Sequence, residues 1–272
     1  MDKKMPRTVG ISTKKEGLNR PTFECYCNNG IGAVEVSVAH EDYDAQDLEA
    51  IASDARAESI DPWSFHLRFS PFERYTLQLA DGDARRFATE YAAEWIKKAG
   101  HAGFRHAVIH PSGEPIEDAD RAEAMKRSKD ALATLAQVAR DAGIVLCVEN
   151  LPRTCLAKNS AELLELLSVD EGLRACFDTN HLLKEPTLDF MRAVGDKIVT
   201  LHLSDYDFIN ERHWLPGDGQ IDWRGLMRTL DEIGYGGVMM YETGKTLKNG
   251  EERMLTVEDR AQNAAWLESL RI

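Results

Sequence analysis

Two short apolar runs, each ending at or beside a carboxylate, suggest the architecture: IVLCVEN at Ile144–Asn150 and RACFD at Arg174–Asp178. Each has the length of a buried strand, and neither contains a Gly or Pro that would interrupt it. Two runs of the same form follow, IVTLHLS at Ile198–Ser204 and GVMMYE at Gly237–Glu242. Polar residues at the ends of successive buried strands are typical of a parallel sheet whose strand ends carry chemistry.

Apolar runs of this kind continue toward the N-terminus, and amphipathic stretches separate them. The earlier candidate strands are TVGIS from Thr8, AVEVSV from Ala33, PWSFHL from Pro62 and RHAVIH from Arg105. Strict alternation of strands and helices predicts a parallel sheet. Eight such units over 272 residues suit a closed barrel, which typically needs ~250 residues. No G-x-G-x-x-G follows the first strand and no P-loop occurs, so we expect a single (β/α)8 TIM barrel domain over residues 1–272.

Helical periodicity fills most of the intervals between these strands. We expect helices at Asp44–Ser59, Asp83–Ala99 and Asp118–Ala142, another between Asp222 and Gly234, and a last one from Val257. Asp222 is a suitable N-cap and Gly234 a suitable C-terminal stop. The interval between the first two strands gives the weakest helical pattern, because it is interrupted by Pro21, Asn28, Asn29 and Gly30.

The composition is that of a globular protein, with 43% hydrophobic and 29% charged residues. The net charge of −13 argues against a partner held mainly by phosphate neutralisation, so no nucleic acid is expected. Five cysteines without a CxxC framework predict reduced, mostly buried thiols. No apolar stretch follows the basic N-terminus, and no run approaches the ~18 apolar residues of a membrane span. A cytoplasmic protein is the expectation.

The strand ends predict a metal site. Strand side chains of a barrel alternate between the interior and the helix layer, and this alternation places Glu149, Asp178 and His202 inside, while Glu242 ends the last strand. Three carboxylates crowded together repel one another, and burying them unpaired is unfavourable. One divalent cation removes that penalty, and three oxygen ligands with one imidazole suit Mn²⁺, Mg²⁺, Co²⁺ or Zn²⁺.

Each of these residues also has a plainer explanation when it is taken alone. Asp178 is placed to cap the following helix, and His202 is placed to be a hydrogen-bonded core histidine. Either glutamate has the charge to pair with an arginine. Their joint occurrence at four successive strand ends favours the metal site.

Further polar residues gather at the same rim. They are His66 and His110 at the ends of the third and fourth strands, His181 in DTNH, and Glu211 and His213 in ERHWLPGDGQIDW. We treat them as candidate substrate-binding residues, while a supporting role, an additional metal site and a structural role stay open. Glu35, near the end of the second strand, is a further candidate for which a structural role is equally plausible.

Several phrases of the sequence resemble the xylose isomerase-like TIM barrel superfamily, in particular its sugar phosphate isomerase/epimerase group. They are VEN at Val148–Asn150, FDTNH at Phe177–His181, LHLSD at Leu201–Asp205, HWLPGDGQIDW at His213–Trp223 and YET at Tyr241–Thr243. All of these phrases lie in the second half of the chain, and the resemblance covers nearly the whole chain.

The resemblance implies a mechanism as well as a fold. It implies that the metal is carried by Glu149, Asp178, His202 and Glu242, and that the metal grips the carbonyl and neighbouring hydroxyl of a small sugar or polyol ketone. One glutamate, Glu149 or Glu242, would remove a proton next to the carbonyl to give a cis-enediolate, and the other would return a proton. His181 and His213 would bind substrate hydroxyls.

The sequence departs from the ketose 3-epimerase branch at two positions. Members of that branch usually carry a second glutamate where this chain has Cys155, and an arginine where it has Phe208. Hydroxypyruvate isomerases, inosose isomerases or dehydratases and dehydroshikimate dehydratases are related members. Arg153 and Lys245 each follow a metal glutamate, where they would either meet an anionic substrate group or be solvated loop charges.

Two other classes of function stay open. The barrel-type apurinic/apyrimidinic endonucleases build a multi-zinc site from the same strand ends, and the histidines at this rim fall where such a site needs ligands. The acidic balance argues against that class. A non-catalytic sugar-binding barrel is the third possibility. The expected partner is a small sugar or polyol, and the aromatic loop near Trp214 is a candidate interface for a homo-oligomer.

Overall fold

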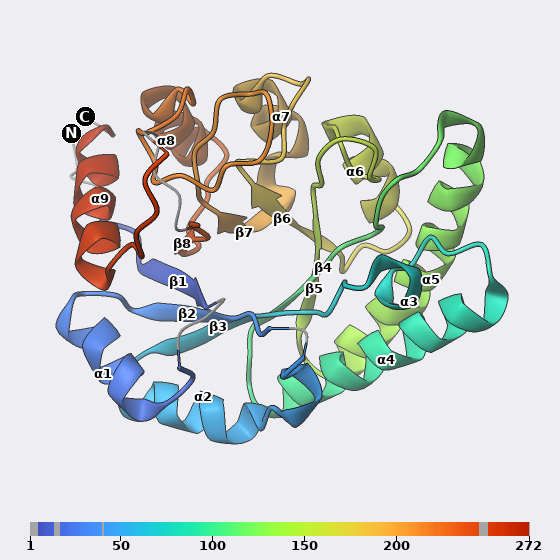
Figure 1. Cartoon of the computed structure of the whole chain (residues 1–272), viewed down its shortest axis with the longest axis horizontal. Helices are drawn as coiled ribbons and strands as arrows, with labels where there is room; N and C mark the ends of the chain where they lie inside the picture. The colour runs from blue at the N-terminus through green and yellow to red at the C-terminus, as the bar shows by residue number, and fades with distance from the viewer. Residues whose placement is uncertain (1–4, 14–16, 40, 245–249, 272) are drawn as a thin grey trace.

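The computed structural model describes residues 5–13, 17–39, 41–244 and 250–271. Over these residues the chain forms a ring of parallel strands enclosed by helices (Figure 1). The predicted (β/α)8 barrel is confirmed, and each of the expected strands is present. No helix of the described residues is long and apolar enough to cross a membrane.

The strands and helices alternate along the chain, with short 3₁₀ turns (η) between some of them. The strands are β1 Val9–Thr13, β2 Ala33–Val36, β3 Asp61–His66, β4 His106–Ile109, β5 Val145–Glu149, β6 Arg174–Asp178, β7 Ile198–His202 and β8 Met239–Tyr241. The helices are α1 Arg20–Asn28, α2 Leu48–Ala57, α3 Phe72–Tyr75, α4 Gly82–His101, α5 Arg121–Asp141, α6 Ser160–Leu167, α7 Thr187–Val194, α8 Trp223–Glu232 and α9 Val257–Ser269. The 3₁₀ turns are η1 Tyr43–Ala45, η2 Asp118–Asp120 and η3 Gly195–Lys197.

Neighbouring strands of the barrel pair in chain order, and β1 also pairs with β8. The junction between β7 and β8 is the thinnest part of the ring, because it has an isolated bridge between Leu203 and Tyr241 in place of a ladder. Two backbone hydrogen bonds close it: Leu203 N donates to Met240 O at 2.7 Å, and Glu242 N donates to Leu203 O at 3.1 Å.

The interval between β1 and β2 is a regular helix, contrary to its weak helical pattern. Asn19 caps α1 by accepting from Thr22 N, and Pro21 lies in the first turn, where a residue without an N–H is tolerated. The residues Asn28, Asn29 and Gly30 end the helix, and Gly30 adopts φ 77°. The residues that interrupt the helical pattern therefore lie at the two ends of α1.

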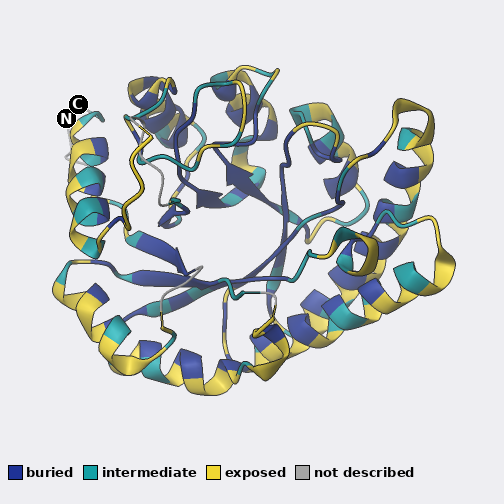
Figure 2. Cartoon of the chain, in the orientation of Figure 1, coloured by how far each residue is buried: buried dark blue, intermediate teal, exposed yellow. Residues whose placement is uncertain are grey.

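The strands are mostly buried, whereas the helices carry buried and exposed residues on different sides (Figure 2). The alternation of strand faces separates two apolar layers. Leu146, Val148 and Phe177 pack outward against the helices, whereas Cys147 and Cys176 pack inside the barrel with Val108. Apolar residues fill the barrel interior toward the N-terminal ends of the strands. The polar residues lie at the opposite end, where the strands finish. The three cysteines in or after strands are buried as predicted, but Cys25 and Cys27 are exposed on α1, and all five cysteines are free thiols.

Candidate metal centre and active-site pocket

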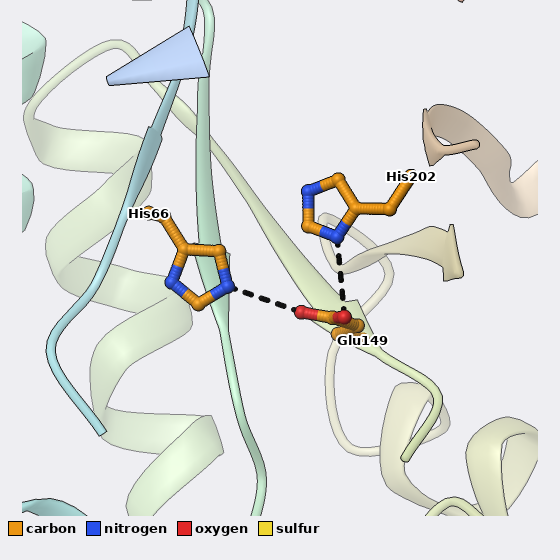
Figure 3. A group of neighbouring side chains, drawn as sticks. All are labelled: His66, Glu149 and His202. Atoms are coloured by element: carbon orange, nitrogen blue, oxygen red, sulfur yellow. Dashed lines mark hydrogen bonds and ion pairs between the residues drawn. The ribbon is translucent and has the colours of Figure 1, made fainter. Parts of the chain in front are cut away.

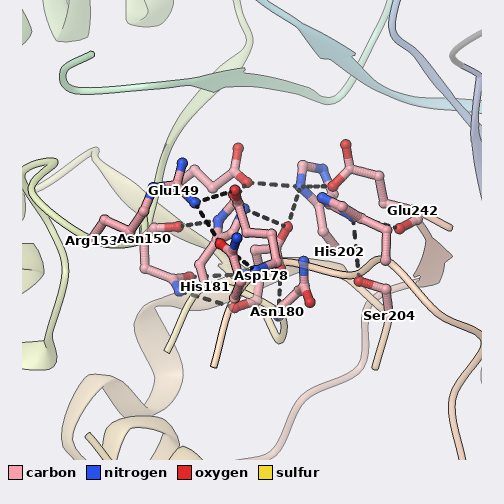
Figure 4. A network of polar contacts seen from close by, with 12 residues as sticks. Glu149, Asn150, Arg153, Asp178, Asn180, His181, His202, Ser204 and Glu242 are labelled. Atoms are coloured by element: carbon pink, nitrogen blue, oxygen red, sulfur yellow. Dashed lines mark hydrogen bonds and ion pairs between the residues drawn. The ribbon is translucent and has the colours of Figure 1, made fainter. Parts of the chain in front are cut away.

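The four predicted metal ligands converge at the C-terminal ends of β5 to β8 (Figure 4). His202 Nδ1 lies 3.1 Å from Glu149 Oε1, 3.4 Å from Glu242 Oε2 and 3.8 Å from Asp178 Oδ2. All four side chains are buried, and one donor atom from each lies within 4.8 Å of the others. The four side chains expected at the strand ends therefore lie together in the structure.

Asp178 gives the clearest sign that this ring suits a cation. Its Oδ1 accepts from Asn180 N at 2.6 Å, but its Oδ2 is buried without a hydrogen-bond partner. Burial raises the pKa of Asp178 well above its usual range, and Glu242 and Glu149 add to the rise against the opposing effect of His181. A buried carboxylate oxygen in this state needs either a proton or a cation, and the donor set of three carboxylates and one imidazole fits a divalent metal.

Glu149 is held by two further histidines at the same rim. His66 Nε2 lies 3.2 Å from Glu149 Oε2, while Oε1 faces His202 (Figure 3). His110 Nε2 also lies 3.2 Å from Glu149 Oε2. Burial opposes ionisation of Glu149, but His202 and His110 outweigh it and hold its pKa well below its usual range. His66 Nδ1 contacts Leu67 O at 2.9 Å, which orients the ring toward Glu149.

Just beyond the strand ends, polar side chains hydrogen-bond to the backbone of the neighbouring strand. These bonds hold the predicted ligands in place. Asn150 Nδ2 donates to Asp178 O at 2.9 Å, and Asp178 N donates back to Asn150 Oδ1 at 2.8 Å. Between the next two strands, Thr179 Oγ1 donates to Ser204 O at 2.6 Å and accepts from Ser204 N at 3.0 Å. The motifs VEN and DTNH therefore contain two of the predicted ligands, Glu149 and Asp178, together with residues that hold them in place.

His181, Glu211 and His213 form a second group at the rim, with donor atoms within 4.8 Å of one another. His181 Nδ1 contacts Asn150 O at 2.8 Å, and its Nε2 lies 3.0 Å from Glu211 Oε1. Burial opposes a charge on His181, but Asp178 and Glu211 outweigh it and raise its pKa to about 10. His213 Nδ1 contacts Glu242 O at 3.1 Å, so this group adjoins the first.

Arg153, for which either contact with an anionic substrate group or a solvated loop position was expected, pairs with carboxylates and also lines the cavity. Its Nε lies 2.9 and 3.0 Å from the two carboxylate oxygens of Glu114, and its Nη1 pairs with Glu211. It thereby joins the loops after β4, β5 and β7 above the ring. The pKa of Glu211 is lowered to about 2, since His181 and Arg153 outweigh the opposing effect of burial. Lys245 lies outside the described residues.

The phrase LPGDGQIDW folds around one buried carboxylate, that of Asp205. It accepts from Tyr206 N at 2.8 Å, Gly217 N at 2.8 Å and Trp223 Nε1 at 2.7 Å. A Cβ on Gly219 would lie 2.2 Å from Asp205 Oδ1, so glycine is required there. This loop carries His213, and Asp205 was identified in the sequence only as part of a motif.

A cavity of about 460 Å³ opens onto the ring and is lined by Glu149, His181, His213 and Glu242. Phe69, which also lines the cavity, stacks on His110 with ring centroids 4.1 Å apart and planes 18° apart. The lining therefore combines polar and charged groups with aromatic rings. Such a mixed surface suits a polyhydroxylated ligand, whose C–H faces pack on rings while its hydroxyls meet polar groups.

Glu35 is the one candidate whose position was least clear from the sequence. It lies wholly buried beneath the ring, with Oε1 2.9 Å from His202 Nε2. It does not face the cavity. Ser12 and Ser64, which contact it, were not recognised in the sequence, because a lone serine in a strand carries no distinguishing pattern.

Comparison with known proteins identifies the family. The family model for the xylose isomerase-like TIM barrel matches residues 27–270, and the chain belongs to this family. The resemblance inferred from the motifs is thereby confirmed.

Curated relatives of known and unknown activity share parts of the chain. An uncharacterised protein of Methanocaldococcus jannaschii is 25% identical over 182 residues, covering 64% of this chain and 62% of its own length. The fructoselysine 3-epimerase of Escherichia coli O157:H7 is 36% identical over 58 residues, 21% of each chain. The probable endonuclease 4 of Thermoplasma acidophilum is 23% identical over 220 residues, covering 74% and 72%. The inosose dehydratase of Klebsiella pneumoniae is 27% identical over 143 residues, covering 44% and 48%.

Solved structures agree on the fold. A D-tagatose 3-epimerase-like protein superposes with a TM-score of 0.80 at 20% identity, covering 97% of this chain and 96% of that one. An L-ribulose 3-epimerase gives a TM-score of 0.79 at 20% identity, covering 98% and 96%. At this level of identity the likeness establishes the barrel and not the reaction.

Proposed function

We propose that this protein is a divalent-metal-dependent isomerase or epimerase of a small sugar, keto-polyol or related ketone. The observation that carries the proposal is the ring of three carboxylates and one imidazole, in which Asp178 Oδ2 is buried without a hydrogen-bond partner. The fructoselysine 3-epimerase relative supports the reaction class. Mn²⁺, Mg²⁺, Co²⁺ and Zn²⁺ all suit the donor set.

Glu149 and Glu242 are the acid and base of the proposed reaction. They come from β5 and β8, with β6 and β7 between them, so they flank the site from two sides. One accepts the proton from the carbon beside the carbonyl, and the other delivers a proton to the adjacent carbon or to the opposite face. A bound divalent cation would supply the positive charge that stabilises the enediolate between these two transfers.

The surrounding histidines give the two glutamates different surroundings. His202 and His110 hold the pKa of Glu149 well below its usual range against the effect of burial, and His66 Nε2 contacts its carboxylate at 3.2 Å. Glu149 is thereby ionised and oriented to act as the base. The carboxylate of Glu242 faces His202 Nδ1 at 3.4 Å, and its backbone oxygen is contacted by His213 Nδ1. His181 and His213 line the cavity and are placed to bind substrate hydroxyls.

Solvent exchange tests the proposed reaction directly. The protein is incubated with Mn²⁺ in deuterated water together with a panel of ketoses, inososes and hydroxypyruvate, and each compound is analysed by mass spectrometry. Deuterium at the carbon beside the carbonyl, with an isomer or epimer as product, supports the proposal. Loss of water from an inosose or dehydroshikimate would instead indicate a dehydratase, and binding without exchange would indicate a sugar-binding barrel.

A second candidate function is favoured by the extra ligand groups. His66, Glu149 and His202 form one group, and His181, Glu211 and His213 form another, so the rim offers donors for more than one cation. The endonuclease 4 relative covers 74% of this chain. The net charge of −13 argues against a nucleic-acid substrate. Cleavage of abasic-site DNA by the zinc-loaded protein would support this second function, and intact DNA would exclude it.

A further inference from the structure

Glu35 places a carboxylate inside the barrel where an apolar residue would be expected. Its side chain has no exposed surface and lies on β2, across the interior from β7. Barrel interiors are usually filled by branched apolar side chains. Below it, the neighbouring interior residues Ala33 and Val238 follow that rule, and Glu35 does not.

The surroundings of Glu35 compensate its charge from three strands. Ser12 Oγ on β1 donates to Glu35 Oε1 at 2.8 Å, and Ser64 Oγ on β3 donates to Oε2 at 2.7 Å. His202 Nε2 on β7 lies 2.9 Å from Oε1. The geometry of this last contact is not that of a hydrogen bond, so it is an electrostatic contact. A buried carboxylate is tolerated only with such partners.

His202 is therefore held between two environments, one at each ring nitrogen. Nδ1 faces the carboxylates of Glu149, Asp178 and Glu242 at 3.1–3.8 Å. Nε2 faces Glu35 alone among these acids. A neutral imidazole has one N–H and one lone pair. Without a cation, Nδ1 hydrogen-bonds Glu149 at 3.1 Å. A cation bound at Nδ1 would require the proton on Nε2, and Glu35 is the carboxylate beside that nitrogen.

We infer that Glu35 is a positioning residue that holds the proton of His202 on Nε2 and so presents the Nδ1 lone pair to a divalent cation. The inference rests on the metal site of the proposed function but not on the reaction. Glu35 does not touch the cavity, so it acts through His202. Ser12 and Ser64 orient its carboxylate from the opposite sides.

Metal affinity measures this role without any substrate. Binding of Mn²⁺ and Co²⁺ to the metal-free protein is measured by isothermal titration calorimetry for wild type and for Glu35→Gln, which keeps the shape and removes the charge. We expect the variant to bind 10- to 100-fold more weakly, the range typical of such supporting carboxylates. Ser64→Ala is the matched control, because it removes a hydrogen bond to Glu35 but no contact with His202, and it should lose less affinity than Glu35→Gln.

The protonation pattern of His202 provides a second test that needs no variant. In the Zn²⁺-loaded wild type, long-range ¹H–¹⁵N spectra should show His202 protonated at Nε2 and coordinated through Nδ1. Coordination through Nε2, or a Glu35→Gln affinity within twofold of wild type in a variant with native circular dichroism, would overturn the role of Glu35. Failure of the wild type to bind any of these metals would instead refute the metal site itself.

Discussion

The carboxylate of Asp178 combines full burial, two neighbouring carboxylates and an oxygen without a hydrogen-bond partner among the described residues. In the metal-free protein its pKa is raised above the unfolded value, which is about 3.9. The folded state therefore binds the proton more tightly, and stability is lost as the pH rises from the unfolded pKa through the raised folded pKa. A cation reverses this balance because it stabilises the ionised form.

Asp178→Asn should thus separate stability from metal binding. The amide keeps an oxygen for Asn180 N but removes the charge, so the metal-free variant should unfold at the same or a higher temperature than wild type at pH 8. The stabilisation that added Mn²⁺ gives to the wild type should disappear. Thermal melts with and without Mn²⁺ between pH 5 and pH 8 measure both effects. A variant that gains as much stability from Mn²⁺ as wild type would show that Asp178 is not a ligand.

The acid–base assignment makes a prediction for Glu149 and Glu242. Glu149→Gln and Glu242→Gln should each abolish turnover of whichever substrate exchanges deuterium, while the protein stays folded, because each change removes a proton-transferring group but little volume. Steady-state kinetics and circular dichroism check the two halves of the expectation. Glu165→Gln, on the exposed pair between Glu165 and Lys129, is the control. Near-normal activity in either active-site variant would contradict the two-glutamate mechanism.

Among the elements, α9 is the helix that follows the last strand, and its N-terminus is stabilised by a capping box. Thr256 Oγ1 accepts from Asp259 N at 3.1 Å, and Asp259 Oδ2 accepts from Thr256 N at 2.7 Å. Arg253 adds an ion pair to Asp259, and its effect together with these bonds lowers the pKa of Asp259 to about 2 against burial. The contribution of Asp259 is present above its unfolded pKa and is lost as the pH falls toward 2.

Thr256→Ala should lower the free energy of unfolding by about 1 kcal/mol, the usual effect of losing an N-cap side chain. Thr256→Ser keeps the hydroxyl and should stay within about 0.5 kcal/mol of wild type. Urea unfolding at pH 7 measures both. Asp259→Asn should differ from wild type at pH 7, and this difference should shrink as the pH is lowered from 4 toward 2. Equal stabilities of Thr256→Ala and Thr256→Ser would show that the box does not contribute.

The elements of the barrel could be predicted from local patterns because each strand is short, apolar and buried. The sequence pattern was less informative where one residue type is compatible with two local structures. Pro21 suggests a break, but it lies in the first turn of α1. The expected helix Asp44–Ser59 is divided into the 3₁₀ turn Tyr43–Ala45 and α2, with Asp47 as the N-cap.

The site was predictable to the extent that it depends on strand alternation. Glu149, Asp178 and His202 follow from a period of two and from the position of the strand ends. The pairing of Arg153 did not follow, because Glu114 and Glu211 lie 39 and 58 residues away in the chain. Such contacts depend on where the loops of several strands meet, which no local pattern records.

At the scale of the whole molecule, the proposed metal would join four strands across the thinnest part of the ring. Glu149, Asp178, His202 and Glu242 come from β5 to β8, and the β7–β8 junction consists of a single bridge with its flanking hydrogen bonds. A cation bound to both sides of this junction would hold it closed. Metal binding and barrel closure should therefore be coupled.

Chelation tests this coupling in two ways. Removal of the metal should abolish activity reversibly, and it should lower stability by about 2.7 kcal/mol relative to protein held at 100 times the dissociation constant. The loss of hydrogen-exchange protection that follows metal removal should also be local. The amides of Leu203 and Glu242, which close the β7–β8 junction, should lose more hydrogen-exchange protection than those of the β2–β3 ladder, because the metal ligands lie on one side of the barrel. Uniform loss of protection around the ring would show that the metal does not act at this junction in particular, and full activity in the metal-free protein would show that the reaction does not need a metal.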